Sequence, residues 1–194
     1  RVAVPLTNDS AIIKPQSMYV VMLVKQICDL NESIKQFDEE IATAFAQHPD
    51  EQLFRSLPGS GDAMAPRLMT AFGDDRDRYE AAEEMGSHSG IAPVTRSSGK
   101  YHSVKKRNAC NKFLRQTFHE FADHSRKWST WAKAFYKMKR ASGMKHHAAL
   151  RALAYKWIRI IFRLWKNRKI YNEAHYTEQL QRHNSPIIKF LETT

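Results

Sequence analysis

The sequence has 194 residues, of which 42% are apolar, with seven Gly and seven Pro; this composition is typical of a soluble globular protein and excludes low-complexity and plainly disordered classes. The net charge of +11 is uneven, because residues 1–94 carry 8 Lys and Arg against 15 Asp and Glu (net −7), whereas residues 95–194 carry 23 against 5 (net +18). So basic a second half favours a polyanionic partner such as nucleic acid; the alternatives are a solvated, highly charged helical surface and, as a weaker competitor, a membrane surface.

The first long element is a predicted helix over residues 18–48, after a connector over residues 1–17 that contains Pro5 and Pro15. Apolar residues recur in it on a heptad, which predicts a coiled-coil arm that pairs with a second copy of itself; the alternative is an amphipathic helix packed on its own domain. The two seams are Val20, Ile27, Ile34 and Ile41, and Leu23, Leu30, Phe37 and Ala44.

Residues 53–73 predict a helix-hairpin-helix, with Gly59 and Gly61 in a tight turn between a short helix and a second helix from about Asp62 to Phe72. Such a turn can present backbone N–H groups and a helix N-terminus to a phosphate, although an ordinary helix–helix corner would have the same residues. The acidic residues that follow, Asp74, Asp75 and Asp77, raise the question of a metal site, but solvated turn carboxylates explain them better.

A loop or a pair of short extended pieces is expected from Gly86 to Ser103, after a short helix at about 78–85. Within it Ser98 lies on a Gly-flanked segment between Arg96 and Lys100, at the edge of the basic region. A hydroxyl beside cations supplies the parts for attack on a phosphodiester. From the residues alone, a phosphate-binding loop is the better interpretation than a nucleophile.

Beyond the loop we expect basic helices over about 105–127, 128–142 and 145–169, with aromatic side chains at the spacing of a buried stripe rather than of base-stacking platforms. The cations on their other faces are suited to phosphate contact. No motif of a Walker loop, dinucleotide turn, nucleophile elbow or zinc helix is present, and the adjacent His146 and His147 with the separated Cys28 and Cys110 predict no metal site in this chain. No apolar run approaches the roughly 20 residues that a membrane helix needs, so no membrane contact is expected.

An ordered series of short motifs resembles the transposase domain of the DEDD insertion-sequence family, the IS-one-hundred-and-ten group. The resemblance covers about residues 50–125, and similar helical sequence continues to about residue 184. The motifs are Leu57-Pro58-Gly59-Ser60-Gly61, Pro66-Arg67-Leu68, Ala71-Phe72-Gly73-Asp74, Gly90-Ile91-Ala92-Pro93, Ser98-Gly99-Lys100 and Lys112-Phe113-Leu114-Arg115.

The resemblance implies a mobile-element recombinase with an N-terminal RuvC-like domain that holds Mg²⁺, a coiled-coil arm, and a C-terminal domain whose serine attacks DNA, directed by a guide RNA. Its serine lies five residues after the loop proline, which is Ser98 here, with Ser97 as the neighbour that could be confused with it. The fold implied is all-α: the arm, a helical transposase domain over 50–184 and a tail over 185–194. No RuvC-like part is present in these residues, so we expect a fragment that is inactive alone, needs Mg²⁺ only with the missing domain, and comes from the bacterial or archaeal cytoplasm, associated with the nucleoid.

The sequence is therefore compatible with three functions. The first is the serine-bearing half of a transposase; the second is a helical DNA- or RNA-binding protein without chemistry; the third is an assembly module that acts through the heptad helix. The nucleic-acid contacts expected besides Ser98 are Gly59, Gly61, Arg96, Lys100, Lys105, Lys106, Arg107, Lys112 and Arg115.

Overall fold

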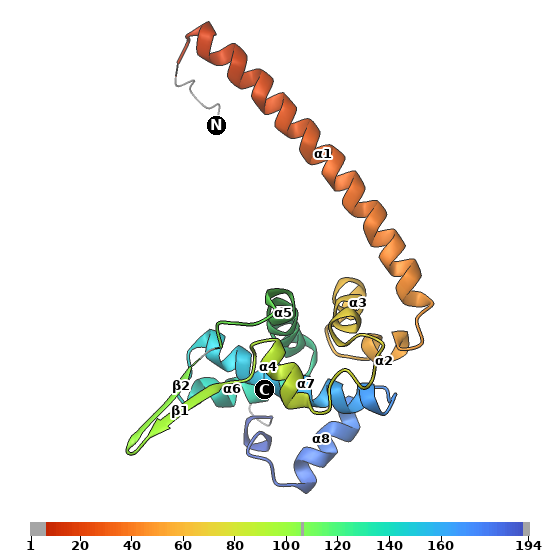
Figure 1. The fold of residues 1–194 in the computed structure, drawn as a ribbon, viewed down its shortest axis with the longest axis vertical. Coiled ribbons are helices and arrows are strands. Elements are labelled where there is room, and N and C mark those ends of the chain that lie inside the picture. The colour runs from red at the N-terminus through yellow and green to blue at the C-terminus, as the bar shows by residue number, and fades with distance from the viewer. Residues whose placement is uncertain (1–6, 106, 192–194) are drawn as a thin grey trace. The chain divides into compact units, whose positions relative to one another are not determined.

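The structure is a computed structural model that describes residues 7–105 and 107–191. The chain divides into two units, residues 1–44 and residues 45–194. The predicted all-α class is confirmed, and the described residues add one β-hairpin to the helices (Figure 1). The elements are α1 (Ser10–Ala46), α2 (Glu51–Arg55), α3 (Gly61–Phe72), α4 (Ala82–His88), β1 (Val94–Ser98), β2 (Tyr101–Lys105), α5 (Lys112–Trp128), α6 (Thr130–Ala141), α7 (His146–Lys166), α8 (Glu173–Arg182) and the 3₁₀ helix η1 (Ile188–Phe190).

Helix α1 starts at Ser10, so the expectation of a connector as far as residue 17 is wrong for its second half. Asp9 caps the helix, because its carboxylate accepts a hydrogen bond from the backbone N–H of Ala11 at 2.9 Å. Pro15 lies inside the helix, where the missing N–H leaves the carbonyl of Ala11 to solvent. Both heptad seams stay largely exposed; Leu30, for example, is 62% exposed and Phe37 68%.

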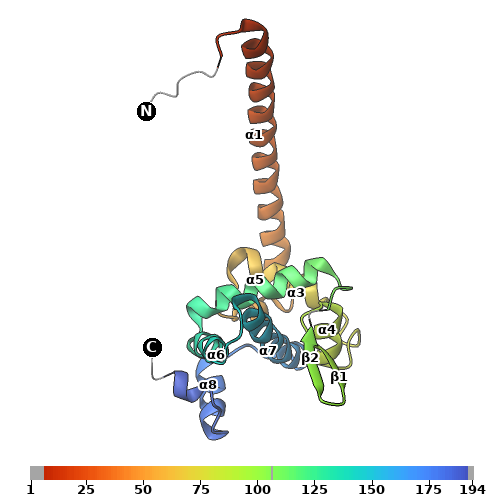
Figure 2. The same cartoon turned by 90° about the vertical axis from the view of Figure 1, so that its left-hand side faces the viewer.

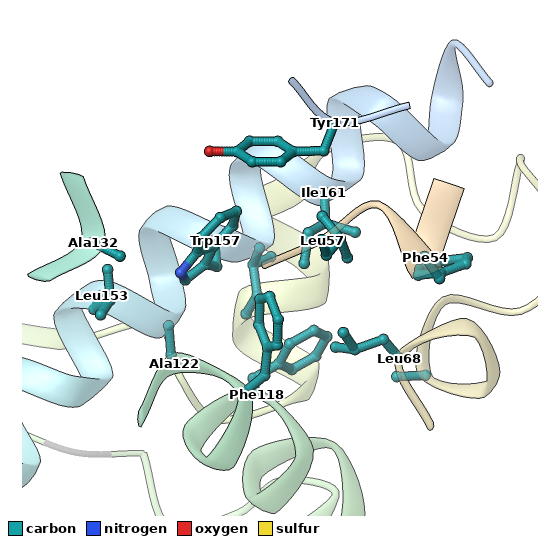
Figure 3. Packing of buried hydrophobic residues seen from close by; sticks show 14 of the residues in the cluster. Phe54, Leu57, Leu68, Phe118, Ala122, Ala132, Leu153, Trp157, Ile161 and Tyr171 are labelled. Carbon is teal, nitrogen blue, oxygen red and sulfur yellow. The ribbon is translucent and has the colours of Figure 1, made fainter. Parts of the chain in front are cut away.

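The core of the second unit is built around α7, which contacts α4, α5 and α6 (Figure 2). Trp157 at its centre is fully buried and packs on Phe121 and Trp131, with ring centroids 5.2 and 4.7 Å away. Figure 3 shows Phe118, Leu57 and Ile161 in the same cluster. The interpretation of the aromatic stripe as core is confirmed for these residues; burying a large apolar side chain contributes about 2–3 kcal/mol.

Side-chain caps set the boundaries of the basic helices. The side chain of Asn111 accepts a hydrogen bond from the N–H of Leu114, that of Ser129 from Ala132, and that of Asn172 from His175. Helix α5 therefore starts at Lys112 rather than near residue 105; β2 ends at Lys105, and a bend lies at Ala109 and Cys110.

A chain of buried and half-buried hydrogen bonds ties α6 to the start of α8. Trp131 Nε1–H donates to the hydroxyl of Tyr171 at 2.7 Å, and this hydroxyl donates to Glu173 at 2.6 Å. Glu173 also accepts from the hydroxyl of Ser129 at the start of α6. Burial, together with the bond to Glu173, raises the pKa of Tyr171 well above its ordinary value, so this phenol stays a donor.

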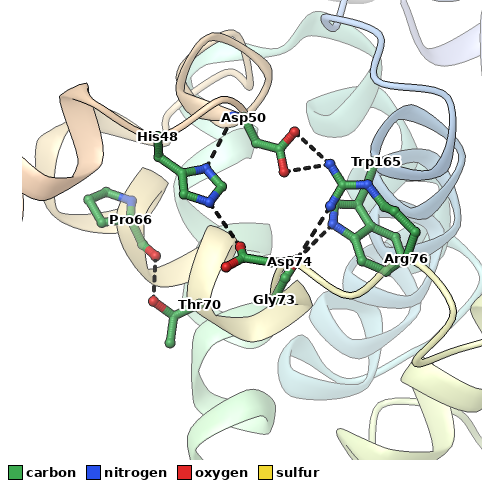
Figure 4. Close-up of polar contacts among 8 residues, drawn as sticks. All are labelled: His48, Asp50, Pro66, Thr70, Gly73, Asp74, Arg76 and Trp165. Atoms are coloured by element: carbon green, nitrogen blue, oxygen red, sulfur yellow. Dashed lines mark hydrogen bonds and ion pairs between the residues drawn. The ribbon is translucent and has the colours of Figure 1, made fainter.

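A second polar cluster connects the residues that follow α1 with those that follow α3 (Figure 4). Arg76 donates to both carboxylate oxygens of the buried Asp50 at 2.5 Å and stacks over Trp165, with 4.6 Å from the guanidinium carbon to the ring centroid. Trp165 Nε1–H donates to the carbonyl of Gly73, and Nε2 of His48 lies 2.8 Å from Asp74. These contacts hold the start of the second unit to the end of α7.

Candidate nucleic-acid interface

The segment that carries Ser98 folds as an antiparallel hairpin of β1 and β2, so of the two expected forms, a loop or a pair of short extended pieces, the second is confirmed for residues 94–103. Ser98 pairs with Tyr101 in the ladder, which leaves Gly99 and Lys100 as a two-residue turn. Gly99 has a φ of +54°, whereas Lys100 does not have a positive φ. This is the pattern of a type II′ turn, which requires glycine at its first central position.

The structure places Ser98 at the tip of the hairpin with an exposed side chain, and the hairpin projects from the helical body of its unit (Figure 1). Lys100, also exposed, is two residues away in the turn. Ser97 pairs with His102, so its side chain points to the opposite face of the hairpin from that of Ser98. A ligand on one face of the hairpin therefore meets one of these two hydroxyls, not both.

The foot of the hairpin is fixed by the Gly-Ile-Ala-Pro motif. The N–H groups of Ile91 and Ala92 both donate to the carbonyl of Gly86, which lies in the last turn of α4. Gly90 has a φ of +69°, and a Cβ on it would lie 2.7 Å from Cβ and Sγ of Cys110. Only glycine meets both conditions at this position, so the motif explains how the hairpin leaves α4.

The other predicted phosphate contacts fall into separate groups. Lys105 and Lys112 are exposed, and Arg107 is half-buried. Arg115 donates to the carbonyls of Arg107 and Asn108, at 2.7 and 3.1 Å, and therefore holds the segment between β2 and α5. Lys106 and the side chain of Arg96 lie outside the described residues.

Two helices joined by a tight turn are present at the predicted helix-hairpin-helix, although α2 has only five residues. The two glycines differ in their surroundings. Gly59 packs against α5, since its Cβ would lie 3.2 Å from the carbonyl oxygen of His124. Gly61 at the start of α3 is open, with nothing within 4 Å of that position. The neighbouring Asp62 pairs with Arg55 at 3.0 Å and places a carboxylate beside this helix start. Of the two, Gly61 is the position that a phosphate could approach.

The three Asp residues after α3 do not form a site for Mg²⁺. Asp74 contacts His48, Asp75 accepts a hydrogen bond from the N–H of Asp77, and Asp77 lies 3.9 Å from Lys166. Across residues 7–105 and 107–191 no group of three or more His, Cys, Asp or Glu could hold a metal ion. The magnesium chemistry that the family resemblance implies therefore finds no fitting residues in the described part of this chain.

The sequence interpretation missed two lysines that the structure brings together, Lys139 on α6 and Lys156 on α7. In the sequence, Lys156 stands between Tyr155 and Trp157. A cation flanked by two aromatic residues in a helix is a local sign of a partly buried charge, but it does not indicate the pairing with Lys139. Burial first, then the nearby Arg159 and Lys139, lower the pKa of Lys156.

Regarding membranes, no helix among the described residues combines the length and apolar character needed to cross a bilayer.

Comparisons with known proteins bear on this geometry. The model of the transposase IS116/IS110/IS902 family matches residues 51–137. The mini-circle protein for IS117 of Streptomyces coelicolor, which is named as a transposase, is 32% identical over 133 residues, covering 69% of this chain and 32% of that protein.

Two further relatives belong to insertion elements. The uncharacterized 44.8 kDa protein of insertion element IS116 from Streptomyces clavuligerus is 28% identical over 83% of this chain and 40% of its own length. The uncharacterized 42 kDa protein of IS900 from Mycobacterium paratuberculosis is 25% identical over 81% of this chain and 40% of its own length. The chain thus spans between about a third and two fifths of the length of these relatives. Residues 51–137 therefore match the transposase domain of the IS116/IS110/IS902 family, and the alignments with proteins of insertion elements extend this similarity over most of the chain.

Proposed function

We propose that this chain is the C-terminal part of an insertion-sequence transposase, that it binds DNA, and that Ser98 is the nucleophile of strand cleavage and transfer. The observation that carries the proposal is the exposed Ser98 at the tip of a hairpin, two residues from the exposed Lys100. The tip reaches beyond the helical core, so a phosphodiester can approach the hydroxyl without any rearrangement of packed side chains.

The proposed step is a transesterification between the DNA and the serine, and it needs no further reactant. The Ser98 oxygen forms a bond to phosphorus and gives up its proton, while the bond from phosphorus to a deoxyribose oxygen breaks and that oxygen takes a proton. The product is a phosphodiester between Ser98 and the DNA end. A deoxyribose hydroxyl of another strand then attacks this phosphorus, the bond to the serine oxygen breaks, and the two DNA strands are joined. Lys100 next to the tip stabilises negative charge on the non-bridging oxygens.

The rest of the activity requires parts that the described residues lack. We infer that magnesium and its carboxylates come with an N-terminal RuvC-like domain, that a guide RNA selects the DNA sites, and that the chain alone does not transfer strands. Lys105, Lys112 and the open N-terminus of α3 at Gly61 are the positions we assign to phosphate contact. The place of action that fits this function is the bacterial or archaeal cytoplasm, at the nucleoid.

The test uses the full-length parent protein with its donor and target DNA. Ser98→Ala should abolish recombination and leave DNA affinity within about twofold, because one exposed hydroxyl adds little to binding. Ser97→Ala is the matched control, since it removes the neighbouring hydroxyl from the opposite face of the hairpin. Recombination that survives Ser98→Ala, or that is lost only in Ser97→Ala, would contradict the assignment.

A second candidate function is nucleic-acid binding without chemistry. It is favoured by one observation: the neighbours of Ser98 in the chain and in the ladder, which are Ser97, Gly99 and Tyr101, include no His, Asp or Glu that could act as a general base. In this case Ser98→Ala changes neither recombination nor binding. Both candidates require that affinity for DNA fall steeply with salt.

We also propose that α1 pairs with a second copy of itself. Its heptad residues remain exposed along the helix; Ile27 is 56% and Ile34 54% exposed. Exposing a row of apolar side chains this long to water costs free energy, and such a row is typical of a helix that packs against a partner helix. Pairing would bring two serine hairpins into one assembly, which suits a reaction on two DNA strands.

A further inference from the structure

A cavity of about 490 Å³ lies at the foot of the hairpin, within the second unit. It is bounded by residues 91–93, by Val104 and Lys105 of β2, and by the facing sides of α6 and α7. The volume falls in the range of sites that hold small organic ligands, roughly 300–1,000 Å³. The family motif Gly-Ile-Ala-Pro thus forms part of its wall as well as the foot of the hairpin.

The charge around this cavity is of one sign. Five cations line it, and no Asp or Glu is among the lining residues that the structure describes; the cations are Lys105, Lys139, Arg151, Lys156 and Arg159. Within the described residues only one of the five, Arg159, forms an ion pair, with Glu83 at 3.8 Å, and both partners are mostly exposed. The cavity is therefore suited to an anion that it does not obtain from its own chain.

Lys156 is a half-buried cation of the wall, and burial lowers its pKa. Its ammonium lies over the rings of Trp131, Phe135 and Tyr176, 5.9, 5.6 and 5.9 Å from their centroids. Aromatic faces compensate a buried cation only in part, and Arg159 and Lys139 repel it. A bound phosphate would offset both costs, because it pairs with the ammonium in a half-buried, weakly screened position.

The remaining wall is apolar. Phe135 and Tyr155 contribute aromatic rings, and Ala148 and Ala152 supply small side chains. The ring of Tyr155 packs closely against Gly86 of α4, because a Cβ added to Gly86 would lie 2.7 Å from a ring carbon. An aromatic surface next to a cation is the combination that binds an unstacked base and its phosphate.

We propose that this cavity binds one unpaired nucleotide of a nucleic-acid strand, with the phosphate against Lys156 and Lys139 and the base against Tyr155 and Phe135. The inference rests on the proposed nucleic-acid function and adds a site to it. Because the same wall includes Val104 and Lys105, a strand held here runs directly to the hairpin that carries Ser98. The backbone chemistry is common to DNA and RNA, so the test contains both.

The test measures the affinity of the 194-residue chain for short fluorescein-labelled oligothymidine, for oligouridine and for a blunt DNA duplex, at a series of salt concentrations. Lys156→Met should weaken single-strand binding about tenfold, because a charge-assisted contact to phosphate is lost. The slope of log K against log salt should become shallower by about 0.7, the value for one phosphate on a single strand. Met keeps the apolar stem of the lysine and removes a half-buried charge, so the thermal midpoint should not fall below that of the control.

Lys133→Met is the matched control, because Lys133 is an exposed cation on α6 that does not line the cavity. It should leave single-strand affinity within about twofold. Tyr155→Leu should weaken binding of the normal strand but not of an abasic strand, since only the normal strand has bases to stack. The strand type that loses more affinity in Lys156→Met, DNA or RNA, identifies the source of the nucleotide.

The site would be overturned by an unchanged single-strand affinity in Lys156→Met, or by an equal loss of affinity in Lys133→Met. It would also be overturned if an acidic peptide displaced the bound strand from the wild type as effectively as unlabelled oligonucleotide does. If the chain binds strands and Lys156→Met has no effect, the cavity fails while the proposed function stands. If the chain binds no nucleic acid at all, the proposed function fails as well.

Discussion

Gly90→Ala tests how the hairpin is attached to the helical body. The new Cβ would lie 2.7 Å from both Cβ and Sγ of Cys110 and 3.1 Å from a guanidinium nitrogen of Arg115. The backbone there also has a φ of +69°, in the left-handed region that side chains disfavour. The conformational penalty is about 1–2 kcal/mol, and the overlap with packed atoms adds about 1–3 kcal/mol, so we expect a loss of about 3 kcal/mol in the free energy of unfolding.

The assay is urea unfolding followed by tryptophan fluorescence, with Gly143→Ala as the matched control. Gly143 also has a positive φ, +85°, but nothing lies within 4 Å of its Cβ position, so its variant should show the conformational penalty alone. Adding Cys110→Gly to Gly90→Ala should recover part of the difference, because the overlapping atoms are removed. Equal losses in Gly90→Ala and Gly143→Ala would refute the proposed packing at the foot of the hairpin.

Three further predictions concern the rest of the molecule. Asp50→Ala should reduce the free energy of unfolding by about 3 kcal/mol, because it leaves the guanidinium of Arg76 without its buried partner; Glu178→Ala, which removes an exposed ion pair, should cost less than about 0.5 kcal/mol in the same urea assay, and similar losses would contradict the role of Asp50. Burial, with the nearby His147 and Arg151, lowers the pKa of His119, so the unfolded chain binds a proton that the folded chain does not as pH falls through 6.5. The free energy of unfolding should therefore decrease as the pH is lowered below 6.5, and it should decrease less steeply in His119→Gln than in the wild type. Urea unfolding at a series of pH values measures this, and identical pH profiles for the two proteins would contradict it. Ile27→Glu with Ile34→Glu should convert an α1-paired assembly to monomer in sedimentation velocity while Lys35→Glu does not, and a wild type that is monomeric at every concentration would remove the premise.

Much of the helical body follows from periodicity. Trp157, Ile161 and Trp165 recur at the spacing of one helix face, and all three are fully buried. The motifs that carried the family resemblance are in part packing motifs: Leu68 and Phe72 are core residues of α3, and Gly73, whose carbonyl accepts from Trp165, ends that helix. These positions were predictable because local spacing and burial point in the same direction.

Other features depend on contacts that a linear pattern does not contain. Pro15 was expected to lie in a connector, yet it lies within α1, whose exposed face lets water satisfy the freed carbonyl. The sequence predicted a loop or short extended pieces around Ser98 but not their pairing, because the register of the two strands depends on the turn at Gly99. The cavity requires Lys139 and Lys156 from different helices, so no spacing in one helix could reveal it.

The most direct test of the account is to trap the cleaved DNA on the full-length parent protein and locate the linkage by mass spectrometry. A suicide substrate whose cleaved end diffuses away should leave a DNA nucleotide joined to the protein through the oxygen of Ser98. A linkage on Ser97, on a residue outside the hairpin, or no covalent product during active recombination would contradict the account.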